Sequence, residues 1–240
     1  MERPLRLVTY NVHGCKGSDF RIVPERTLDV LRSIDADCIA LQEFVDSRLP
    51  AGRNLLAHWA EELRMTGVYA PAFERGGEVF GNALLTRLDI VEQHNHELSI
   101  AGYRRRAFLD VVLDAGAAVH ITVVHLGVSP TERGLMAAGI DALTSQARGE
   151  VQLCVGDFNE WHHTAVVSSA LRRGFRSSVP LRTFPAVAPL FALDRVWVRP
   201  AACLLEARVH TAPPARWASD HLPLIAVIAL PSSAASGANP

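Results

Sequence analysis

The sequence has few cysteines and no pair of them at a spacing that binds zinc. Its four cysteines, Cys15, Cys38, Cys154 and Cys203, are scattered along the chain, and no CxxC motif occurs. Cys38 and Cys154 lie inside apolar runs, where a small buried thiol is the simplest interpretation. The pattern therefore argues against a zinc-binding or disulfide-stapled domain and favours a reducing compartment.

An excess of charge and a long apolar run are also lacking. The 24 basic and 25 acidic residues give a formal net charge of −1. Proteins that grip nucleic acid regardless of its sequence carry clustered excess cations, so only a locally basic rim is compatible with this composition. No run approaches the ~20 apolar residues of a transmembrane helix, and no charged and then apolar leader precedes the strand-like sequence from Leu5. We expect a cytoplasmic protein with no transmembrane segment, and the sequence indicates no protein partner.

The chain is long enough for one large domain. Its 240 residues are 49% apolar and 20% charged, which fits a globular protein with a substantial core, and sheet-rich folds of this size are commonly undivided. We predict a single domain over residues 1–230. The tail Pro231–Pro240 is rich in serine, alanine and glycine, and we predict that it is disordered.

Strand-like apolar runs alternate with helical patterns along the chain. Helices are predicted from Pro24, from Asn54 to about Met65, from the capping box Ser129-Pro130-Thr131-Glu132, and from about His163 to Arg172. The predicted strands are Leu5–Val12, Cys38–Leu41, Val79–Thr86, Ala107–Leu113, Val119–Val124, Val151–Val155, Ala192–Val198 and Leu224–Leu230. About eight or more strands with about four helices predict two packed sheets flanked by helices.

Short polar motifs accompany these apolar runs from one end of the chain to the other. They read Thr9-Tyr10-Asn11-Val12-His13, Gln42-Glu43, Gly81-Asn82-Ala83-Leu84-Leu85, Gly156-Asp157-Phe158-Asn159 and Ser219-Asp220-His221. A folded protein rarely places carboxylates, amides and imidazoles at strand ends unless they are paired or used. The motifs therefore predict one polar site, assembled from many strand ends, that holds a hard divalent cation and hydrolyses a phosphate ester.

The residue types in these motifs suit phosphate chemistry. Mg²⁺ prefers oxygen ligands and is typically held by one or two carboxylates, and Glu43 is the first candidate. Asp157 and Asn159 lie two residues apart, so on an extended segment their side chains would share a face. A carboxylate there can deprotonate an attacking water, and an amide can hold a phosphate oxygen. The plainer alternatives are a solvated strand cap at Gln42-Glu43 and an Asp-Phe-Asn turn.

The histidines suggest a second functional pair. An imidazole beside a carboxylate has its charged form favoured and its tautomer fixed. A protonated His221 could then donate to a non-bridging oxygen of the scissile phosphate or help the leaving group. Asp194 could orient either His221 or His125. His13 follows Asn11 by two residues and should point the same way, where it either contacts phosphate or lies on the surface.

Taken together, the motifs resemble a known family. With His125 and Leu193-Asp194 added, they occur in the order found in the endonuclease/exonuclease/phosphatase superfamily, over roughly Leu5 to Leu230. That group includes pancreatic-type deoxyribonuclease, abasic-site endonucleases, neutral sphingomyelinases and inositol-polyphosphate 5-phosphatases. The resemblance implies an α/β fold, a four-layer α/β/β/α sandwich of two mostly antiparallel or mixed sheets flanked by helices. It also implies a requirement for Mg²⁺ or Mn²⁺.

The resemblance implies roles for individual residues. Metal ligands would be Glu43, Asp220 and Asn11; catalytic residues would be Asp157 as the water-activating base, Asn159, His221, His125 and Asp194; substrate-binding residues would be Asn11, His13, Arg106 and Asn82. Arg106 is one of three adjacent arginines, and the register of the phosphate contact is open by one residue. Asn82 is expected to stabilise the site rather than touch substrate. Thr183 is a possible rim residue, and we interpret Trp161 and Trp217 as core or wall packing.

The expected activity is that of a metal-dependent phosphodiesterase. Nucleic acid and a phospholipid or other small phosphodiester are both compatible substrates. One alternative is a phosphomonoesterase of the same fold, although nothing marks a pocket for a terminal phosphate. Another is a non-catalytic binding module that retains the fold, which predicts gaps among the acidic and imidazole positions. None of these positions is missing here.

Overall fold

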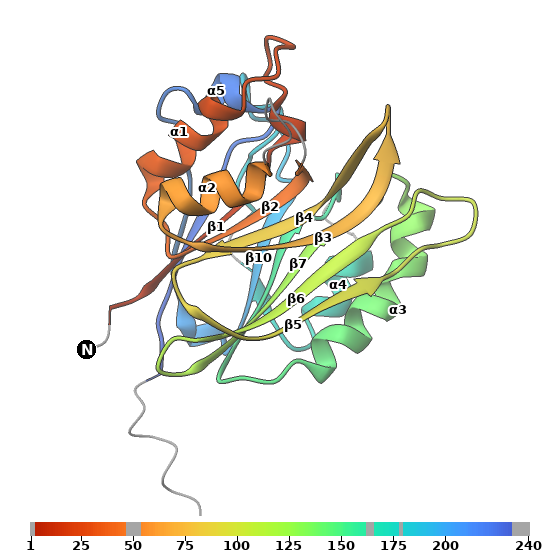
Figure 1. Ribbon diagram of the computed structural model, residues 1–240. Coiled ribbons are helices and arrows are strands. Elements are labelled where there is room, and N and C mark those ends of the chain that lie inside the picture. Colours follow the sequence, from red (N-terminus) through yellow and green to blue (C-terminus); the bar gives the residue numbers. More distant parts are fainter. Residues whose placement is uncertain (1–2, 47–53, 162–165, 178–179, 232–240) are drawn as a thin grey trace, which may run out of the picture.

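The computed structural model describes residues 3–46, 54–161, 166–177 and 180–231. Two six-stranded sheets pack face to face, with orders β11-β12-β1-β2-β4-β3 and β5-β6-β7-β8-β10-β9. Helices α1, α2 and α5 lie on one outer side, and α3 and α4 lie on the other (Figure 1). The predicted four-layer sandwich is confirmed. The predicted tail from residue 232 and the start of the helix near His163 lie outside the described residues.

The element bounds are as follows. The first sheet contains β1 (Leu5–Asn11), β2 (Cys38–Val45), β3 (Thr66–Arg75), β4 (Glu78–Thr86), β11 (Leu204–Val209) and β12 (Leu224–Ile228). The second contains β5 (Asp89–Glu97), β6 (Ala107–Asp114), β7 (Ala118–His125), β8 (Val151–Asp157), β9 (Arg176–Ser177) and β10 (Asp194–Arg199). The helices are α1 (Pro24–Ile34), α2 (Leu55–Leu63), α3 (Pro130–Gln146), α4 (Val166–Leu171), α5 (Ala215–Ala218) and the short 3₁₀ turns η1 (His13–Cys15) and η3 (Ala201–Cys203).

Three apolar cores hold the layers together. One lies between the two sheets and includes Leu109, Ile121 and Val196. A second joins the first sheet to α1, α2 and α5, and a third joins the second sheet to α3 and α4 around Trp197. Central strands are therefore buried on both faces, and such strands read as continuous apolar runs in the sequence. All four cysteines are buried, including Cys38 and Cys154, for which burial was predicted.

Most helix starts follow the local signals in the sequence. Pro24 occupies the first turn of α1, and Asn54 caps α2 through its side-chain oxygen, which accepts from the Ala57 amide at 2.8 Å. The Ser129 side chain caps α3, whose second residue is Thr131. No helix among the described residues is long and apolar enough to cross a bilayer.

Candidate active site

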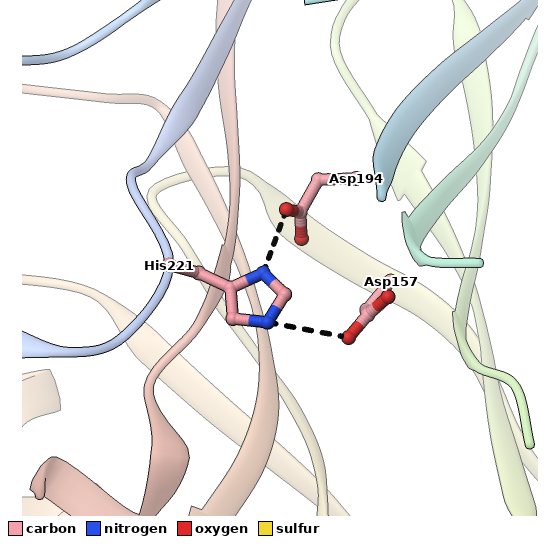
Figure 2. A group of neighbouring side chains, drawn as sticks. All are labelled: Asp157, Asp194 and His221. Atoms are coloured by element: carbon pink, nitrogen blue, oxygen red, sulfur yellow. Dashed lines mark hydrogen bonds and ion pairs between the residues drawn. The ribbon is translucent and has the colours of Figure 1, made fainter. Parts of the chain in front are cut away.

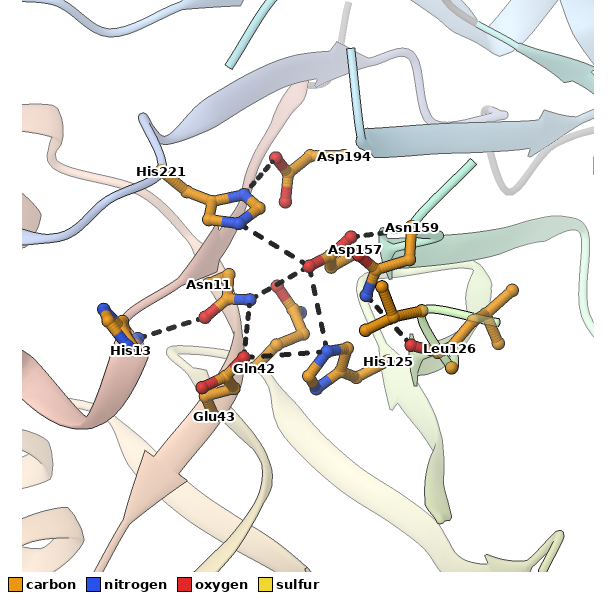
Figure 3. A network of polar contacts seen from close by, with 12 residues as sticks. Asn11, His13, Gln42, Glu43, His125, Leu126, Asp157, Asn159, Asp194 and His221 are labelled. Atoms are coloured by element: carbon orange, nitrogen blue, oxygen red, sulfur yellow. Dashed lines mark hydrogen bonds and ion pairs between the residues drawn. The ribbon is translucent and has the colours of Figure 1, made fainter. Parts of the chain in front are cut away.

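Strand register brings the polar motifs to one edge of the two sheets. β1 and β2 are parallel, and Asn11, the last residue of β1, pairs with Gln42. β7 and β8 are also parallel, with His125 beside Asp157, and β10 runs antiparallel to β8 with Asp194 opposite Asp157. The side chains from both sheets meet in one network (Figure 3). The predicted convergence of the motifs is observed.

Glu43 reaches this network because β2 is bulged. Leu41 pairs with Ala83 and Phe44 with Gly81, so Gln42 and Glu43 together face the single residue Asn82 on β4. Bulges of this kind bend a strand and re-aim a side chain, and they are common beside active sites. Glu43 has a φ of 52°. The prediction that the strand stops at Gln42-Glu43 is wrong, because β2 continues to Val45.

Asp157 is the hub of the network. Its Oδ2 accepts a hydrogen bond from Asn11 Nδ2 at 3.0 Å, and its Oδ1 accepts from the Asn159 backbone amide at 2.9 Å. The same Oδ2 lies 3.7 Å from His221 Nε2 and 3.8 Å from His125 Nε2. The side chain is 2% exposed. These donors fix the orientation of the carboxylate while it faces two imidazoles.

His221 is held between two carboxylates. Its Nδ1 lies 2.8 Å from Asp194 Oδ2, and its Nε2 faces Asp157 (Figure 2). Burial disfavours the imidazolium, but the charges of Asp194 and Asp157 outweigh burial and raise the pKa of His221 to about 10. Asp194 therefore pairs with His221 rather than with His125, which the sequence left open.

His125 has the opposite electrostatic character. Burial lowers its pKa to about 3, against the attraction of Asp157 and with help from the charges of Arg106 and His221. Its Nε2 lies 3.8 Å from both Glu43 Oε1 and Asp157 Oδ2. The site thus pairs a neutral imidazole with a charged one, and the two differ in what they can donate.

Two sets of residues have the chemistry of a metal site. Asp157, Asp194 and His221 offer ligand atoms that lie within 4.8 Å of one another. A ligating imidazole must be neutral, and His221 favours its charged form, so this set is better suited to carrying a proton.

The second set is Glu43, Asn11 and Asp220. Its donors are carboxylate and carboxamide oxygens, and the side chains of Glu43 and Asp220 are 19% and 35% exposed. Partial exposure suits an ion that keeps several waters. Asn11 turns its nitrogen toward Asp157 and Glu43, and its Oδ1 accepts from the His13 backbone amide at 3.0 Å. This set fits Mg²⁺ or Mn²⁺.

Neither His13 nor Asn159 lies on an extended segment. Their φ angles are both 48°, so the shared-face argument from two-residue spacing is wrong for them. His13 lies in η1, where its Nδ1 is 3.4 Å from Asp220 Oδ2. The side-chain amide nitrogen of Asn159, Nδ2, donates to the Leu126 carbonyl at 3.0 Å. Both residues nevertheless remain within the network.

The arginine run before β6 is divided among three partners. Arg106 is buried, and its Nε lies 3.2 Å from Glu132 Oε1 at the start of α3. Arg105 pairs with Glu97, and Arg104 lies over the Phe73 ring. Arg106 therefore influences the site through its charge on His125, and its contact with phosphate stays a prediction.

Asn82 lies beneath the site and does not face solvent. It is 1% exposed, and its Nδ2 donates to the Ala107 carbonyl at 2.7 Å and the Val123 carbonyl at 3.5 Å. These carbonyls belong to the opposite sheet. The side chain thus links the two sheets, which supports the expected stabilising role and not a substrate contact.

Sequence reasoning missed two supporting hydroxyl groups. Thr183, assigned to the rim, is fully buried, and its hydroxyl donates to Asp194 Oδ2. The Ser219 hydroxyl donates to the Asn11 carbonyl at 2.7 Å. Ser219 lies within a recognised motif and Thr183 does not, and hydroxyls are so common that spacing alone does not distinguish the supporting ones. Arg195, which follows Asp194, is buried.

An aromatic wall and a cavity adjoin the His221 imidazole. The Phe184 ring lies 4.9 Å from the His221 ring and 5.7 Å from Trp161, and Trp161 lies 4.8 Å from Phe191. Trp161 and Phe191 line a cavity of about 360 Å³ together with Glu160, Pro180, Arg182, Leu190, Ala192 and Arg195. This space beside the site can receive a part of a ligand that extends past the catalytic residues.

Comparisons with known proteins agree with the motifs. The sequence model of the Endonuclease/Exonuclease/phosphatase family matches residues 8–221. The uncharacterized protein YbhP of Escherichia coli (strain K12) is 30% identical over 251 residues, which cover 94% of this chain and 96% of that protein.

Solved structures share the fold. The endonuclease/exonuclease/phosphatase from Beutenbergia cavernae has a TM-score of 0.77 at 19% identity, over 95% of this chain and 72% of that chain. The catalytic domain of human Nocturnin with bound sulfate has a TM-score of 0.67 at 18% identity, over 95% of each chain. The 3′ phosphatase NExo from Neisseria, bound to product DNA hairpin, has a TM-score of 0.68 at 16% identity, over 94% of this chain and 100% of that chain. At these identities the likeness establishes the fold alone.

Proposed function

The chain belongs to the endonuclease/exonuclease/phosphatase family, and from that premise we propose that it is a divalent-metal-dependent phosphodiesterase. The observation that carries the proposal is the array Asp194–His221–Asp157, in which one imidazole lies between two buried carboxylates. Residues 1–230 act as one catalytic domain. The proposed location is the cytoplasm, in keeping with four scattered, buried cysteines.

Asp157 is the proposed base. Its carboxylate is oriented by Asn11 and by the Asn159 amide, so it can accept a proton from a water placed for in-line attack on phosphorus. Because the donors hold the carboxylate before substrate arrives, little reorganisation accompanies the reaction.

His221 is the proposed donor to the phosphate. Asp194 holds Nδ1, which leaves Nε2–H free to donate. The 3.7 Å between His221 Nε2 and Asp157 Oδ2 is longer than a hydrogen bond. The proton is therefore available to a non-bridging or leaving oxygen, where charge develops in the transition state.

Glu43, Asp220 and Asn11 are the residues proposed to hold Mg²⁺ or Mn²⁺. When bound, the ion neutralises charge on the phosphate and stabilises the leaving oxygen. His125 borders this set on one side, and His13 contacts Asp220 on the other. As a neutral imidazole, His125 adds no positive charge to compete with the ion.

The proposed substrate is a phosphodiester in a nucleic acid, a phospholipid or a small molecule. A phosphomonoester is the second candidate, and it is favoured by the structural likeness to NExo, which is described as a 3′ phosphatase. A binding module without catalysis is disfavoured because every acidic and imidazole position of the network is present.

A substrate panel tests the proposal. Plasmid, single-stranded oligonucleotide, bis(p-nitrophenyl) phosphate, p-nitrophenyl phosphate and phospholipid vesicles are incubated with Mg²⁺, Mn²⁺ or EDTA. We expect hydrolysis of at least one diester that EDTA abolishes and added metal restores. Asp157→Ala and His221→Ala should each lower turnover at least roughly a hundredfold with the fold intact.

Matched controls are available on β5. Asp89 is an exposed carboxylate and His94 is an exposed imidazole, and both lie away from the network. Asp89→Ala and His94→Ala should leave turnover unchanged. Folded Asp157→Ala and His221→Ala variants that retain wild-type rates on every cleaved substrate would contradict the assignment.

A further inference from the structure

Exposed apolar side chains gather on three segments beside the active site. Phe20 and Ile22, in the loop after η1, are 80% and 48% exposed. Trp217 of α5 is 53% exposed, which corrects the expectation that it packs in the core or site wall. Val187 and Leu190, in the segment before β10, are 43% and 60% exposed. We call these five residues the apolar rim.

The three segments form one continuous surface. The Ser18 hydroxyl donates to the carbonyls of Arg216 and Ser219, each at 3.1 Å. Arg216 Nη1 donates to the Val187 carbonyl at 3.3 Å, and the Ala186 amide donates to the Asp220 carbonyl at 2.7 Å. The loop after η1 therefore packs on α5. In Figure 1 the loop stands above α5, at the top of the view.

This surface borders the candidate active site. Asp220 and His221 follow α5 directly, and His13 lies in η1, just before the loop that carries Phe20. The backbone of the loop is closely fitted there, since a Cβ at Gly17 would lie 2.0 Å from the Trp217 carbonyl oxygen. An extended flat surface that contacted the apolar rim would therefore place its outermost chemical groups near the candidate active site.

The rim carries unbalanced positive charge. Lys16, Arg21 and Arg216 lie on the same segments, and among the described residues none of them forms an ion pair with a carboxylate. The nearby Asp19 is neutralised by Arg26 at 2.7 Å. Lys16 Nζ lies 5.3 Å from the centre of the Phe20 ring, so cation and apolar side chain share one face.

We propose that the apolar rim docks the protein on an anionic lipid bilayer, with the candidate active site turned toward the headgroups. Apolar side chains interleaved with cations are the composition of surfaces that bind membrane interfaces. Single-stranded nucleic acid also uses cations, but it stacks its bases on aromatic rings. Ile22, Val187 and Leu190 offer no ring for such stacking. The docking stands on its own, and only its consequence, a substrate in the bilayer, rests on the proposed function.

The fluorescence of Trp217 can be used to measure vesicle binding. Trp59 and Trp197 are fully buried, and Trp161 packs against two phenylalanines. A blue shift of tryptophan emission on vesicle binding therefore reports mainly on Trp217. The full chain in EDTA is mixed with vesicles of phosphatidylglycerol and phosphatidylcholine, or of phosphatidylcholine alone. We expect co-sedimentation and a blue shift with the anionic vesicles, both weakened by salt, and in Trp217→Phe retained binding with the shift abolished.

Variants separate the apolar and the electrostatic contributions. Phe20→Ser with Trp217→Ser should lower vesicle partitioning at least about tenfold, because two apolar side chains lose their contact with the interface. Lys16→Gln with Arg21→Gln should lower it roughly 25-fold, since each cation near an anionic surface contributes a factor of about five. Leu205→Ser and Val91→Ser replace side chains that are 59% and 61% exposed on β11 and β5. These control variants should bind as wild type does.

Several results would overturn the docking. One is equal binding to neutral and anionic vesicles; another is an equal loss of binding in the control variants. A third is the absence of vesicle binding together with rim-dependent binding of a single-stranded oligonucleotide. Wild-type hydrolysis of soluble bis(p-nitrophenyl) phosphate is measured separately. Soluble turnover without vesicle binding removes only the docking, and vesicle binding without any hydrolysis removes only the proposed function.

Discussion

Three site residues hold a backbone conformation that L-residues rarely adopt. His13, Glu43 and Asn159 have φ angles of 48°, 52° and 48°. This region disfavours a non-glycine residue by about 1–2 kcal/mol, so the surrounding contacts must impose it. The bulge of β2 does so for Glu43, and the bond from the Asn159 amide to Asp157 does so for Asn159. Backbone strain is thus placed where side chains have to be aimed.

The proposed ligand role of Glu43 predicts a specific kinetic effect. Glu43→Gln keeps the size of the side chain but removes its charge, so the metal concentration for half-maximal activity should rise at least about tenfold. A titration of Mg²⁺ with bis(p-nitrophenyl) phosphate as substrate measures it. Asp157→Asn is the contrasting variant, in which turnover falls and the titration midpoint stays. An unchanged midpoint in Glu43→Gln would remove Glu43 as a ligand.

The buried carboxylate of Asp110 lies outside the network of the candidate site and should make stability depend on pH. Asp110 accepts a bond from the Thr122 hydroxyl at 2.6 Å and lies 3.4 Å from His120 and 3.3 Å from His96. Burial opposes its charged form, but the bonds from His120 and Thr122 outweigh burial and lower its pKa. The stabilisation is therefore present above the unfolded value of about 3.9, and it is lost as pH falls through the lower folded value.

Asp110→Asn tests this effect. The variant should be less stable than wild type by about 1.5–3 kcal/mol at pH 7, as for a lost hydrogen bond to a charged group. The difference should shrink once the pH falls below about 3.9. Urea unfolding followed by circular dichroism at both pH values measures it. A difference that does not change with pH would mean that the charge of Asp110 contributes nothing.

At the scale of elements, the sequence predicted all eight interior strands and none of the four at the edges. The missing strands β3, β5, β9 and β11 are the outermost of their sheets. β5, with the sequence DIVEQHNHE, is largely exposed. Natural sheets protect their unpaired edges with polar residues, so the apolar pattern that marks a strand is absent from β5.

Some features of the candidate site could likewise be predicted from the sequence, and others could not. The motifs at Asn11, Asp157 and His221 were readable because each adjoins a buried strand: Asn11 and Asp157 end one, and His221 precedes one. The bulge at Gln42-Glu43 was not, because an extra residue on one strand depends on the register of its neighbour β4. The partner of Asp194 was also open, since a distance between remote segments decides it.

Gly156 and Gly134 provide a matched test of how tightly β8 packs beside β7. Gly156 in β8 has a φ of 141°, and a Cβ there would lie 1.8 Å from the Val124 carbonyl oxygen. Gly156→Ala must push β8 away from β7, so we expect a loss of at least about 3 kcal/mol. Gly134 in α3 has open space around it, and Gly134→Ala should gain roughly 0.5–1 kcal/mol. Urea denaturation of both variants measures the difference, and similar effects in the two would contradict the packing of β7 on β8.

At the scale of the whole molecule, the active site straddles the two sheets. Asn11 and Glu43 come from the first sheet, and Asp220 and His221 from the segment that enters it. His125, Asp157 and Asp194 come from the second sheet. The bond from Asn11 to Asp157 spans this division. The geometry of the site therefore depends on how the two sheets are held together, and not on either sheet alone.

Asn82 is the residue through which this dependence can be tested. It faces the bulge that carries Glu43, and its amide donates to the Ala107 and Val123 carbonyls of the other sheet. Asn82→Ala leaves these buried carbonyls without that donor, so stability should fall by about 1–3 kcal/mol. Turnover should fall at least about tenfold, because a shift of about 1 Å at a reacting group can lower rates a hundredfold.

Asn95 provides the matched control for that experiment. Its amide also joins the sheets, donating from β5 to the Tyr69 carbonyl of β3 at 3.3 Å, but it is exposed and lies at the sheet edges. Asn95→Ala should change stability by no more than about 0.5 kcal/mol and leave turnover as in wild type. Urea unfolding and steady-state hydrolysis of one diester compare the two variants. If Asn82→Ala lost stability but kept full turnover, the site would tolerate a shift between the sheets, and alignment of the sheets would not be what positions Glu43 against Asp157.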